Sequence, residues 1–309
     1  MPNVLKKISE LRGVGRVYVM GHSPADFDTL AAAWLAATAL CRAGVDAVPV
    51  LPDIMPSDDD IPAEVMLLHG VDTASWVRAS QVADMGAHFL LVDCHTLCIA
   101  GEICGIIDHH PTNEIPSVPA ELYENSHASS CTLKIYRMAI DCGIAMSAED
   151  ECLAVRSVFM DTQSLLSPKF VPADRAWIED MIKKHSLDET DLRRRGICLA
   201  DISRPVSELA AGGLKYYTLA GVRCASSHLQ AEDIPEKLIA ECVACLAQRR
   251  DREGVSVWVF YAAEPLLGRS VVVYITKDGT VHREYDRFLS RAKDIIPDLE
   301  LRLSQGLDF

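Results

Sequence analysis

The sequence of 309 residues has no apolar run long enough to cross a membrane and no excess of basic charge. A membrane-spanning helix needs about 18 or more consecutive apolar residues, and the first residues also lack the apolar stretch of a secretory signal. Thirty Lys and Arg stand against 44 Asp and Glu, which gives a formal net charge of -14. Because non-specific binding to long nucleic acid depends on many Lys and Arg contacts to phosphates, such binding is not expected. We therefore expect a cytoplasmic protein that binds neither membranes nor long duplex nucleic acid.

The sequence also lacks the cysteine spacing of a disulfide scaffold or of a four-thiolate zinc site. Its eleven cysteines are scattered and form a single CxxC, at Cys242 and Cys245. These two thiols share one face of a predicted helix with apolar residues, so we interpret them as small buried side chains. Cys94, His95 and Cys98 in "CHTLC" are interpreted as structural too, because no second CxxC completes a zinc site. The cysteines therefore indicate a reducing compartment.

Short apolar strands alternate with helices in the first half of the chain. Strands are expected over residues 16–20, 46–52, 88–94 and 104–110, and helices over 29–43, 129–143 and 151–163. Strands that are apolar along their whole length and separated by helices predict a parallel sheet covered on both faces. The fold class expected for this part of the chain is therefore α/β.

A stretch dense in charge separates this part from a smaller second one. The sequence "KKHSLDETDLRRRG" has no sustained apolar face, so we interpret residues 186–205 as a linker. Beyond it, strands are expected over 216–229, 255–264 and 269–279, and helices over 234–250 and from near Glu284. We therefore expect a parallel-sheet domain over residues 1–185 and a smaller α+β domain over residues 206–309.

Acidic and histidine side chains follow the expected strands and helices at four places. These places are "VMGHSPADFD", "LLVDC", "IIDHH" and "VFMDT", and they contain His22, Asp26, Asp28, Asp93, Asp108, His109, His110 and Asp161. Ligands of open parallel sheets bind outside the carboxyl ends of the strands, where such loops converge. Each residue alone could cap a helix or lie in a core, but together the carboxylates would repel one another. Divalent cations remove that repulsion, and mixed Asp and His ligation suits Mn²⁺ or a related ion.

These four motifs, in this order, resemble those of the DHH phosphoesterase superfamily over about residues 15–165. That superfamily includes exonucleases, oligoribonucleases, cyclic-dinucleotide phosphodiesterases, exopolyphosphatases and manganese-dependent pyrophosphatases. The "DFD" sequence at residues 26–28 is itself similar to exopolyphosphatase-related members. The resemblance implies a hydrolase with a DHH-type N-terminal domain and two bound Mn²⁺ ions, for which Mg²⁺ and Co²⁺ are alternatives.

The resemblance also implies a role for each of these residues. Six of them would bind metal: His22, Asp26 and Asp93 the first ion, and Asp28, Asp93, His109 and Asp161 the second. Asp108 would orient a histidine, and His110 would face the substrate phosphate, so that Asp93, Asp108 and His110 together form the catalytic set. Two divalent ions can activate a water and stabilise both sides of a displacement at phosphorus. The expected reaction is therefore hydrolysis of a phosphodiester or phosphoanhydride bond.

Three further residues are candidate substrate contacts. Ser129 and Ser130 in "HASSCT" open a helix whose N-terminus could bind phosphate, and plain N-capping is the alternative. Arg269 begins a strand in the second domain, where a solvated side chain is the alternative. The superfamily usually has Gly after "DT", whereas this chain has Gln163, a change expected to narrow the pocket.

The second domain lacks the glycine-rich GGGH-type motif of oligoribonuclease-like members. We interpret it as a divergent, DHHA1-like substrate-binding domain. The leading hypothesis is a Mn²⁺-dependent phosphoesterase that acts on short oligonucleotides or nucleotide bisphosphates. The alternatives are hydrolysis of inorganic polyphosphate or pyrophosphate, and a catalytically weak nucleotide-binding regulator. The expected partner is thus a small phosphorylated substrate, and the oligomeric state is left open between a monomer and a homodimer.

Overall fold

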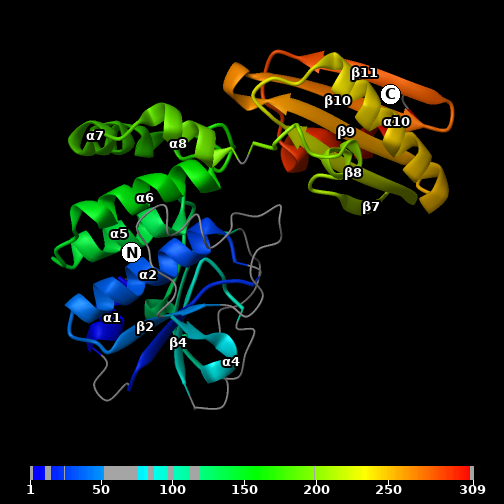
Figure 1. The fold of residues 1–309 in the computed structure, drawn as a ribbon. Helices are drawn as coiled ribbons and strands as arrows, with labels where there is room; N and C mark the ends of the chain where they lie inside the picture. The colour runs from blue at the N-terminus through cyan, green and yellow to red at the C-terminus, as the bar shows by residue number, and fades with distance from the viewer. Residues whose placement is uncertain are drawn as a thin grey trace. The chain divides into compact units, whose positions relative to one another are not determined.

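The computed structural model describes residues 3–10, 15–23, 25–51, 76–82, 87–96, 101–110, 118–197 and 199–306. The chain divides into two compact units, Met1–Gly196 and Ile197–Phe309. Each unit has a sheet of its own (Figure 1). The division falls within the stretch predicted to be a linker, part of which is helical, because residues Glu189–Gly196 form α8.

A six-stranded sheet forms the frame of the N-terminal unit, with the strand order β3-β2-β1-β4-β5-β6. Its strands are β1 (Val17–Met20), β2 (Ala47–Leu51), β3 (Val77–Arg78), β4 (His88–Val92), β5 (Glu102–Asp108) and β6 (Tyr123–Asn125). Every neighbouring pair is parallel, which confirms the predicted α/β class. Because the strands are parallel, the residues that follow β1, β4 and β5 meet at one edge of the sheet.

Helices cover both faces of this sheet, because successive side chains of a strand point to opposite faces. In β1, Val17 packs into the larger apolar cluster, and Tyr18 packs into a second cluster on the other face. The first face carries α1 (Val4–Glu10), α2 (Phe27–Arg42), α5 (Cys131–Asp141) and α6 (Ala148–Asp161), with α7 (Arg175–His185) and α8 packed against α6 (Figure 1). The other face includes α4 (Ala79–Val82).

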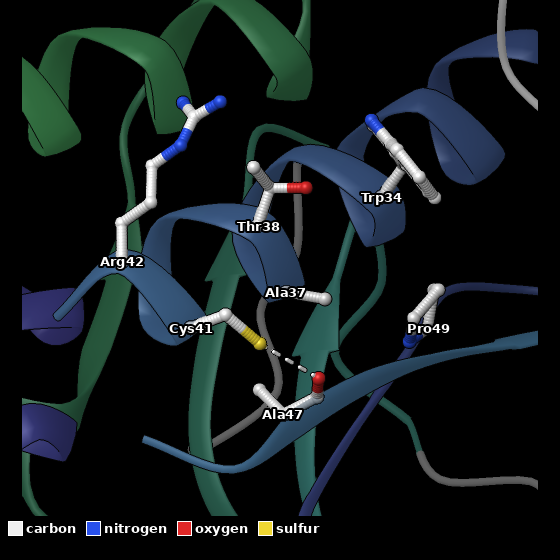
Figure 2. A pocket seen from close by; sticks show the side chains of 7 residues that line it. All are labelled: Trp34, Ala37, Thr38, Cys41, Arg42, Ala47 and Pro49. Carbon is white, nitrogen blue, oxygen red and sulfur yellow. Dashed lines mark hydrogen bonds between the residues drawn. The ribbon is translucent and has the colours of Figure 1, made fainter. Parts of the chain in front are cut away.

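Helix α2 packs tightly against the sheet because its sequence, FDTLAAAWLAATALCR, is rich in alanine. Alanine has the highest helix propensity and leaves room for close approach to β1, β2 and β4. The helix begins two residues earlier than expected, at Phe27, because Asp26 caps it. Toward its C-terminal end, Trp34 and Cys41 line a pocket of about 420 Å³ together with Pro49 of β2 (Figure 2).

The C-terminal unit is built on a five-stranded sheet with the order β11-β10-β9-β8-β7. Its strands are β7 (Lys215–Leu219), β8 (Val222–Gln230), β9 (Val257–Glu264), β10 (Arg269–Thr276) and β11 (Gly279–Tyr285). Helix α10 (Glu236–Glu253) joins β8 to β9, the one parallel pair, and packs on one face with α9 (Val206–Ala210). Helix α11 (Ile296–Gln305) packs on the other face, where Leu299 enters the core. The α+β character expected of this unit is confirmed.

Two elements of this unit differ from the expectation. Residues 216–229 were expected to form one strand, but Ala220 and Gly221 have φ of 47° and 78° and turn the chain between β7 and β8. Positive φ at both central residues is the signature of a type I′ hairpin turn. The helix expected from near Glu284 is also wrong, because Glu284 lies in β11 opposite Val271. This outer strand carries charged side chains, as exposed edge strands do, and such a pattern is easily mistaken for a surface helix.

No described helix is both long and apolar enough to cross a membrane. The cysteines of the described residues are free, and Cys242 is fully buried in the core under α10. Cys94 is buried beyond the end of β4, and Cys98 lies outside the described residues.

Candidate metal centre

The eight acidic and histidine residues singled out in the sequence meet at the carboxyl edge of the parallel sheet. They come from the loop after β1 and the start of α2 (His22, Asp26, Asp28), the end of β4 (Asp93), the end of β5 (Asp108, His109, His110) and the end of α6 (Asp161). Potential ligand atoms lie within 4.8 Å of one another in three groups: His22, Asp26 and Asp93; Asp93, His109 and His110; and Asp28, His109 and Asp161. Asp93 and His109 each belong to two groups, so the three groups form one continuous centre.

The loop after β1 is held close to the sheet at Gly21. A Cβ at this position would lie 2.3 Å from Cγ2 of Thr29 and 2.9 Å from the carbonyl oxygen of Val92, so only glycine fits. Asp26 caps α2 by accepting a hydrogen bond of 2.9 Å from the backbone N–H of Thr29. Its other oxygen lies 3.6 Å from Nε2 of His22. The capping interaction and the proposed ligand role therefore use different oxygens of the same carboxylate.

Asp93 lies at the middle of the centre. Its φ of 57° places it in the left-handed region, and its N–H donates to the carbonyl of Ile107 in the neighbouring strand. Left-handed backbone costs a non-glycine residue about 1–2 kcal/mol, and such strain clusters at functional sites. The Thr29 hydroxyl donates to Oδ2 of Asp93 over 2.8 Å, and Nε2 of His22 lies 3.5 Å from the same oxygen. The carboxylate is thus fixed on one side and faces His109 with the other.

Three buried polar atoms of the centre have no hydrogen-bond partner within the described chain. They are Oδ1 of Asp93, Nε2 of His109 and Oδ2 of Asp161. Nε2 of His109 lies 3.0 Å from the Asp93 atom and 3.7 Å from the Asp161 atom. Buried polar groups are almost always paired, and leaving one unpaired costs about 1–3 kcal/mol. Three such atoms facing one another are what a cation-binding site requires.

The orientation of His109 is set by its other ring nitrogen. Nδ1 lies 3.0 Å from the carbonyl oxygen of Ala128, which can only accept a hydrogen bond. Nδ1 therefore carries the proton, and in the neutral ring Nε2 has a free lone pair directed into the centre. A ligating histidine is typically held by a backbone carbonyl or a carboxylate in this way.

Asp28 connects the centre to α5 and α6 through hydrogen bonds. Its Oδ2 accepts from the N–H of Cys131, and its Oδ1 accepts from the N–H and hydroxyl of Thr132 and from the hydroxyl of Ser157, over 2.5–3.0 Å. Oδ2 also lies 3.7 Å from Nε2 of His109 and accepts a single hydrogen bond from the described residues. Asp28 therefore has a structural role at the start of α5 in addition to its predicted ligand role.

Asp108 does not belong to the three groups of potential metal ligands. Its carboxylate instead lies within hydrogen-bond distance of two imidazole rings. Its Oδ1 lies 2.9 Å from Nδ1 of His110, and its Oδ2 lies 2.9 Å from Nδ1 of His95. Oδ1 also accepts from the backbone N–H groups of His109 and His110. Burial raises the pKa of Asp108, but the bonds from His110 and His95 outweigh this and lower it to about 2. A fixed, charged carboxylate thus holds Nδ1 of His110, and the catalytic role predicted for Asp108 stays a prediction.

The carboxylates and imidazoles of the centre shift one another's pKa strongly. Burial and the charges of Asp93 and Asp161 raise the pKa of Asp28 to about 7. Burial lowers the pKa of His109, but the carboxylates of Asp93 and Asp28 outweigh it and raise the pKa to about 10. For His22 the neighbouring carboxylates likewise outweigh burial and raise the pKa to about 11. The centre therefore stabilises positive charge strongly, and divalent cations are the strongest local source of such charge.

The donor set fits divalent cations of the Mn²⁺ kind. Carboxylate oxygens and imidazole nitrogens are present, and no cysteine belongs to any of the groups found among the described residues. Hard oxygen donors with imidazole suit Mn²⁺ and related ions, whereas thiolates would favour zinc or copper. The three buried atoms without hydrogen bonds supply the physical reason for a cation at this place.

The predicted phosphate contacts lie outside this group. Ser129 is fully buried, donates to Oδ2 of Asp174 over 2.5 Å and accepts from the N–H of Val171. Ser130 is also fully buried and caps α5 by accepting from the N–H of Leu133. Arg269, in the C-terminal unit, pairs with Glu264 over 2.7 Å. The two serines thus have structural hydrogen bonds, and the contact of all three residues with phosphate stays a prediction.

Lys169 was not predicted from the sequence, and its Nζ donates to Oδ1 of Asp161 over 2.6 Å. It lies in "SPKF", eight residues after Asp161, where no strand or helix periodicity marks it. The sign of a turn was present at Gln163, which occupies a position where the superfamily usually has Gly. The structure gives Gln163 a φ of 48°, the left-handed conformation that glycine adopts most easily.

Comparison with known proteins gives the following similarities. Residues 16–156 match the model of the DHH family, N-terminal domain. A manganese-dependent inorganic pyrophosphatase from Methanothrix thermoacetophila is 22% identical over 315 residues, which cover 92% of this chain and 97% of that protein. The crystal structure of a protein from Methanococcus jannaschii, assigned as a family II inorganic pyrophosphatase, shares 20% identity at a TM-score of 0.59.

The alignment to the Methanococcus jannaschii structure covers 94% of this chain and 100% of that chain, so the similarity of fold extends over both units. An exopolyphosphatase-related protein from Bacteroides fragilis aligns with 98% of this chain and 97% of its own, at 14% identity and a TM-score of 0.49.

Proposed function

Because residues 16–156 match the model of the DHH family, N-terminal domain, we propose that this chain is a Mn²⁺-dependent hydrolase of phosphoanhydride bonds in inorganic pyrophosphate or short polyphosphate. The relative that matches nearly its whole length, a manganese-dependent inorganic pyrophosphatase, supports this substrate class. As substrate we therefore favour inorganic pyrophosphate or polyphosphate, the alternative expected from the sequence, over short oligonucleotides and nucleotide bisphosphates.

One observation carries the proposal. Oδ1 of Asp93, Nε2 of His109 and Oδ2 of Asp161 are buried, face one another and have no hydrogen bonds to the described residues. Structural ion pairs satisfy their atoms with hydrogen bonds, and this cluster does not. Its unpaired atoms lie where parallel strands end, the usual position of ligands in this fold class.

The metal ligands we propose are the six residues predicted from the sequence. His22, Asp26 and Asp93 form one group, and Asp28, His109 and Asp161 form the other. Asp93 lies close to both, because its two oxygens face His22 and His109 respectively. Divalent cations bound here would lower the pKa of a water and neutralise charge on the phosphoryl group.

The chain itself supplies the orientation of the reacting groups. Asp108 holds Nδ1 of His110, so the opposite edge of the His110 ring is directed away from that carboxylate. The His110 side chain is 35% exposed, in contrast to the buried His109, so it can reach a phosphate that enters from solvent. The bond from Asp108 stabilises the protonated ring and raises the pKa of His110. His110 is therefore suited to donate a hydrogen bond to a phosphoryl oxygen.

The C-terminal unit is proposed to bind substrate, as expected from the sequence. It has no GGGH-type motif, and Arg269 is its candidate phosphate contact from the sequence. The ion pair of Arg269 with Glu264 leaves the arginine side chain 57% exposed, so its guanidinium stays accessible. Loss of an arginine contact to phosphate would raise KM more than it lowers kcat.

A substrate panel tests the proposal. Metal-free protein, reloaded with Mn²⁺, Mg²⁺ or Co²⁺, is incubated with pyrophosphate, tripolyphosphate, a dinucleotide and 3′-phosphoadenosine 5′-phosphate, and released phosphate or nucleotide is measured. We expect turnover of the first two with Mn²⁺ and its loss in Asp93→Asn. Asp46→Asn is the matched control, because Asp46 pairs with Arg16 at an exposed site. Turnover of the dinucleotide alone, or nucleotide binding without turnover, would overturn the proposal.

A further inference from the structure

Lys169 reaches the candidate metal centre from a loop that leaves α6 at Asp161 and doubles back. Its Nζ donates to Oδ1 of Asp161 over 2.6 Å, while Oδ2 of the same carboxylate is directed toward His109. The Lys169 side chain is 44% exposed, whereas that of Asp161 is 6% exposed. The lysine side chain is therefore much more accessible to solvent than the carboxylate that it contacts.

A strained turn brings Lys169 to this place. Gln163, Ser164 and Leu165 have φ of 48°, 60° and 67°, so three successive non-glycine residues adopt the left-handed conformation. Each costs about 1–2 kcal/mol, and such a run is rare outside functional regions. Ser164 fixes the turn, since its N–H donates to the carbonyl of Phe159 and its hydroxyl donates to that of Arg193.

Gly196 makes room for this turn. A Cβ at Gly196 would lie 2.5 Å from the carbonyl oxygen of Phe159 and 2.6 Å from the Ser164 hydroxyl, so a larger residue would displace the turn. The close approach of α8 thus depends on glycine at its last residue.

Hydrogen bonds also fix the backbone on both sides of Lys169. The N–H of Ser167 donates to the carbonyl of Thr162 over 2.8 Å, and the N–H of Lys169 donates to the Ser167 hydroxyl. On the other side, the N–H of Val171 donates to the buried hydroxyl of Ser129. The lysine is therefore held in a defined position, unlike a side chain on a loose loop.

The ammonium group of Lys169 has N–H donors that form no hydrogen bond with the described residues. Among the described residues its one hydrogen bond is to Asp161, although an ammonium carries three N–H donors. Burial lowers the pKa of Lys169, but the charge and hydrogen bond of Asp161, together with the charges of Asp28 and Asp26, outweigh it and raise the pKa. A partly exposed cation beside the candidate ligands is suited to contact a phosphate that approaches the centre from solvent.

We propose that Lys169 is a substrate-binding residue, whose ammonium group keeps its bond to Asp161 and donates a second hydrogen bond to a phosphoryl oxygen of the substrate. This inference rests on the proposed function. The competing interpretation is that the ammonium occupies the place of a second metal ion. The bond to Oδ1 of Asp161 leaves Oδ2 available to a cation, which favours phosphate binding.

Binding of a non-hydrolysable substrate analogue tests this inference. Isothermal titration calorimetry measures, for wild type, Lys169→Ala and Lys169→Arg, first the number and affinity of Mn²⁺ ions and then the affinity of the loaded protein for imidodiphosphate. We expect Lys169→Ala to weaken imidodiphosphate about 10- to 100-fold, as loss of a hydrogen bond to a charged group does, with Lys169→Arg retaining most of the affinity. The number of Mn²⁺ ions stays the same. Lys184→Ala is the control, because Lys184 pairs with Glu151 at the surface.

Two results would overturn the inference: unchanged imidodiphosphate affinity in folded Lys169→Ala, or an additional Mn²⁺ ion bound by this variant. Melting temperature and circular dichroism establish that each variant is folded. The binding data are independent of turnover, so wild-type protein that binds imidodiphosphate through Lys169 but releases no phosphate would refute the proposed function and leave the role of Lys169 intact.

Discussion

Oδ1 of Asp93 and Nε2 of His109 lie 3.0 Å apart, both buried and neither with a hydrogen bond to any described residue. The strained backbone of Asp93 and the bond from Nδ1 of His109 to Ala128 hold the two atoms in this relation. A carboxylate and an imidazole that merely stabilised the fold would be free to form a well-aligned hydrogen bond. Their fixed arrangement instead directs Oδ1 of Asp93 and, in the neutral ring, the Nε2 lone pair of His109 at a common ligand, which we assign to a divalent cation.

Binding of Mn²⁺ is expected to release protons and to strengthen with pH. Neighbouring carboxylates raise the pKa of His109 to about 10 and that of His22 to about 11, although burial opposes this. Both rings are therefore protonated near pH 7, and a ligating imidazole must be neutral. We expect the affinity to rise about tenfold per pH unit for each proton displaced, below these pKa values.

Calorimetric titration with Mn²⁺ in buffers of different ionisation enthalpy counts the protons released. The variant His22→Gln should release one proton fewer than wild type. An affinity that is constant between pH 6 and 9 would contradict the assignment of these histidines as ligands.

Asp108 is expected to act on catalysis through His110. Replacement of Asp108 by Asn removes the carboxylate that both imidazoles contact, and replacement of His95 by Ala removes one of the contacts that hold it. Substitutions that disturb the orientation of active-site histidines typically cost 10- to 100-fold in activity, so we expect kcat to fall by about this factor with KM changed less. Steady-state kinetics with pyrophosphate measure both constants. His88→Ala is the control, because His88 lies near Glu102 at the far end of β4. Variants within twofold of wild type would refute the role of Asp108.

Replacement of Gln163 by Gly is expected to stabilise the N-terminal unit. Gln163 has a φ of 48°, which costs an L-residue about 1–2 kcal/mol, and part of the gain is offset by the greater freedom of glycine in the unfolded chain. We expect the free energy of unfolding to rise by up to about 1 kcal/mol. Urea unfolding measures the change, and Gln163→Ala, which keeps the strain, should show no gain. A glycine variant less stable than the alanine variant would contradict the left-handed turn.

The C-terminal unit is expected to lose stability in acid because of His228. The ring lies against Gly213 and stacks on Tyr261 at 5.2 Å, and burial together with the charges of Arg291 and Lys215 lowers its pKa to about 4. Its ordinary value is 6.5, so between pH 6.5 and 4 the unfolded chain binds more protons than the folded one. Stability is therefore fully present above pH 6.5 and falls as the pH decreases, by about 3 kcal/mol in total.

Comparison of wild type with His228→Gln separates the pH dependence of stability caused by His228 from that caused by the carboxyl groups. Urea unfolding at pH 7.5, 5.5 and 4.5 should show a steeper loss of stability in wild type than in the variant. Equal slopes would show that His228 is not held neutral in the folded protein.

The meeting of the proposed metal ligands could be predicted from the sequence because each follows an apolar strand or helix whose end is marked locally. Parallel strands bring such ends to one edge, so His22, Asp93 and His109 meet without any knowledge of side-chain detail. The four helices expected over residues 29–43, 129–143, 151–163 and 234–250 are present, and their ends moved by only a few residues, as at Phe27, where the cap at Asp26 decides the start. Helices α1, α4, α7, α9 and α11 were not predicted.

Other features depend on contacts that leave no local mark in the sequence. Lys169 reaches Asp161 through three left-handed residues, and glycine, the usual sign of that conformation, is absent from the turn. Ser129 was a candidate phosphate contact with N-capping as the alternative, and its hydrogen bond to Asp174, 45 residues away in the sequence, could not be foreseen from the local pattern. Glu284 belongs to a strand with exposed charged side chains, whose pairing with β10 decides its conformation.

The most direct test of the account is the rate of phosphate release from pyrophosphate while Mn²⁺ is added stepwise to metal-free protein. We predict that the rate starts near zero, rises with each addition and saturates at about two equivalents of Mn²⁺, as a two-metal site requires. The same titration of Asp93→Asn should give no rise. A rate that is independent of Mn²⁺, or no release of phosphate at any ratio by protein that binds the ion, would contradict the account.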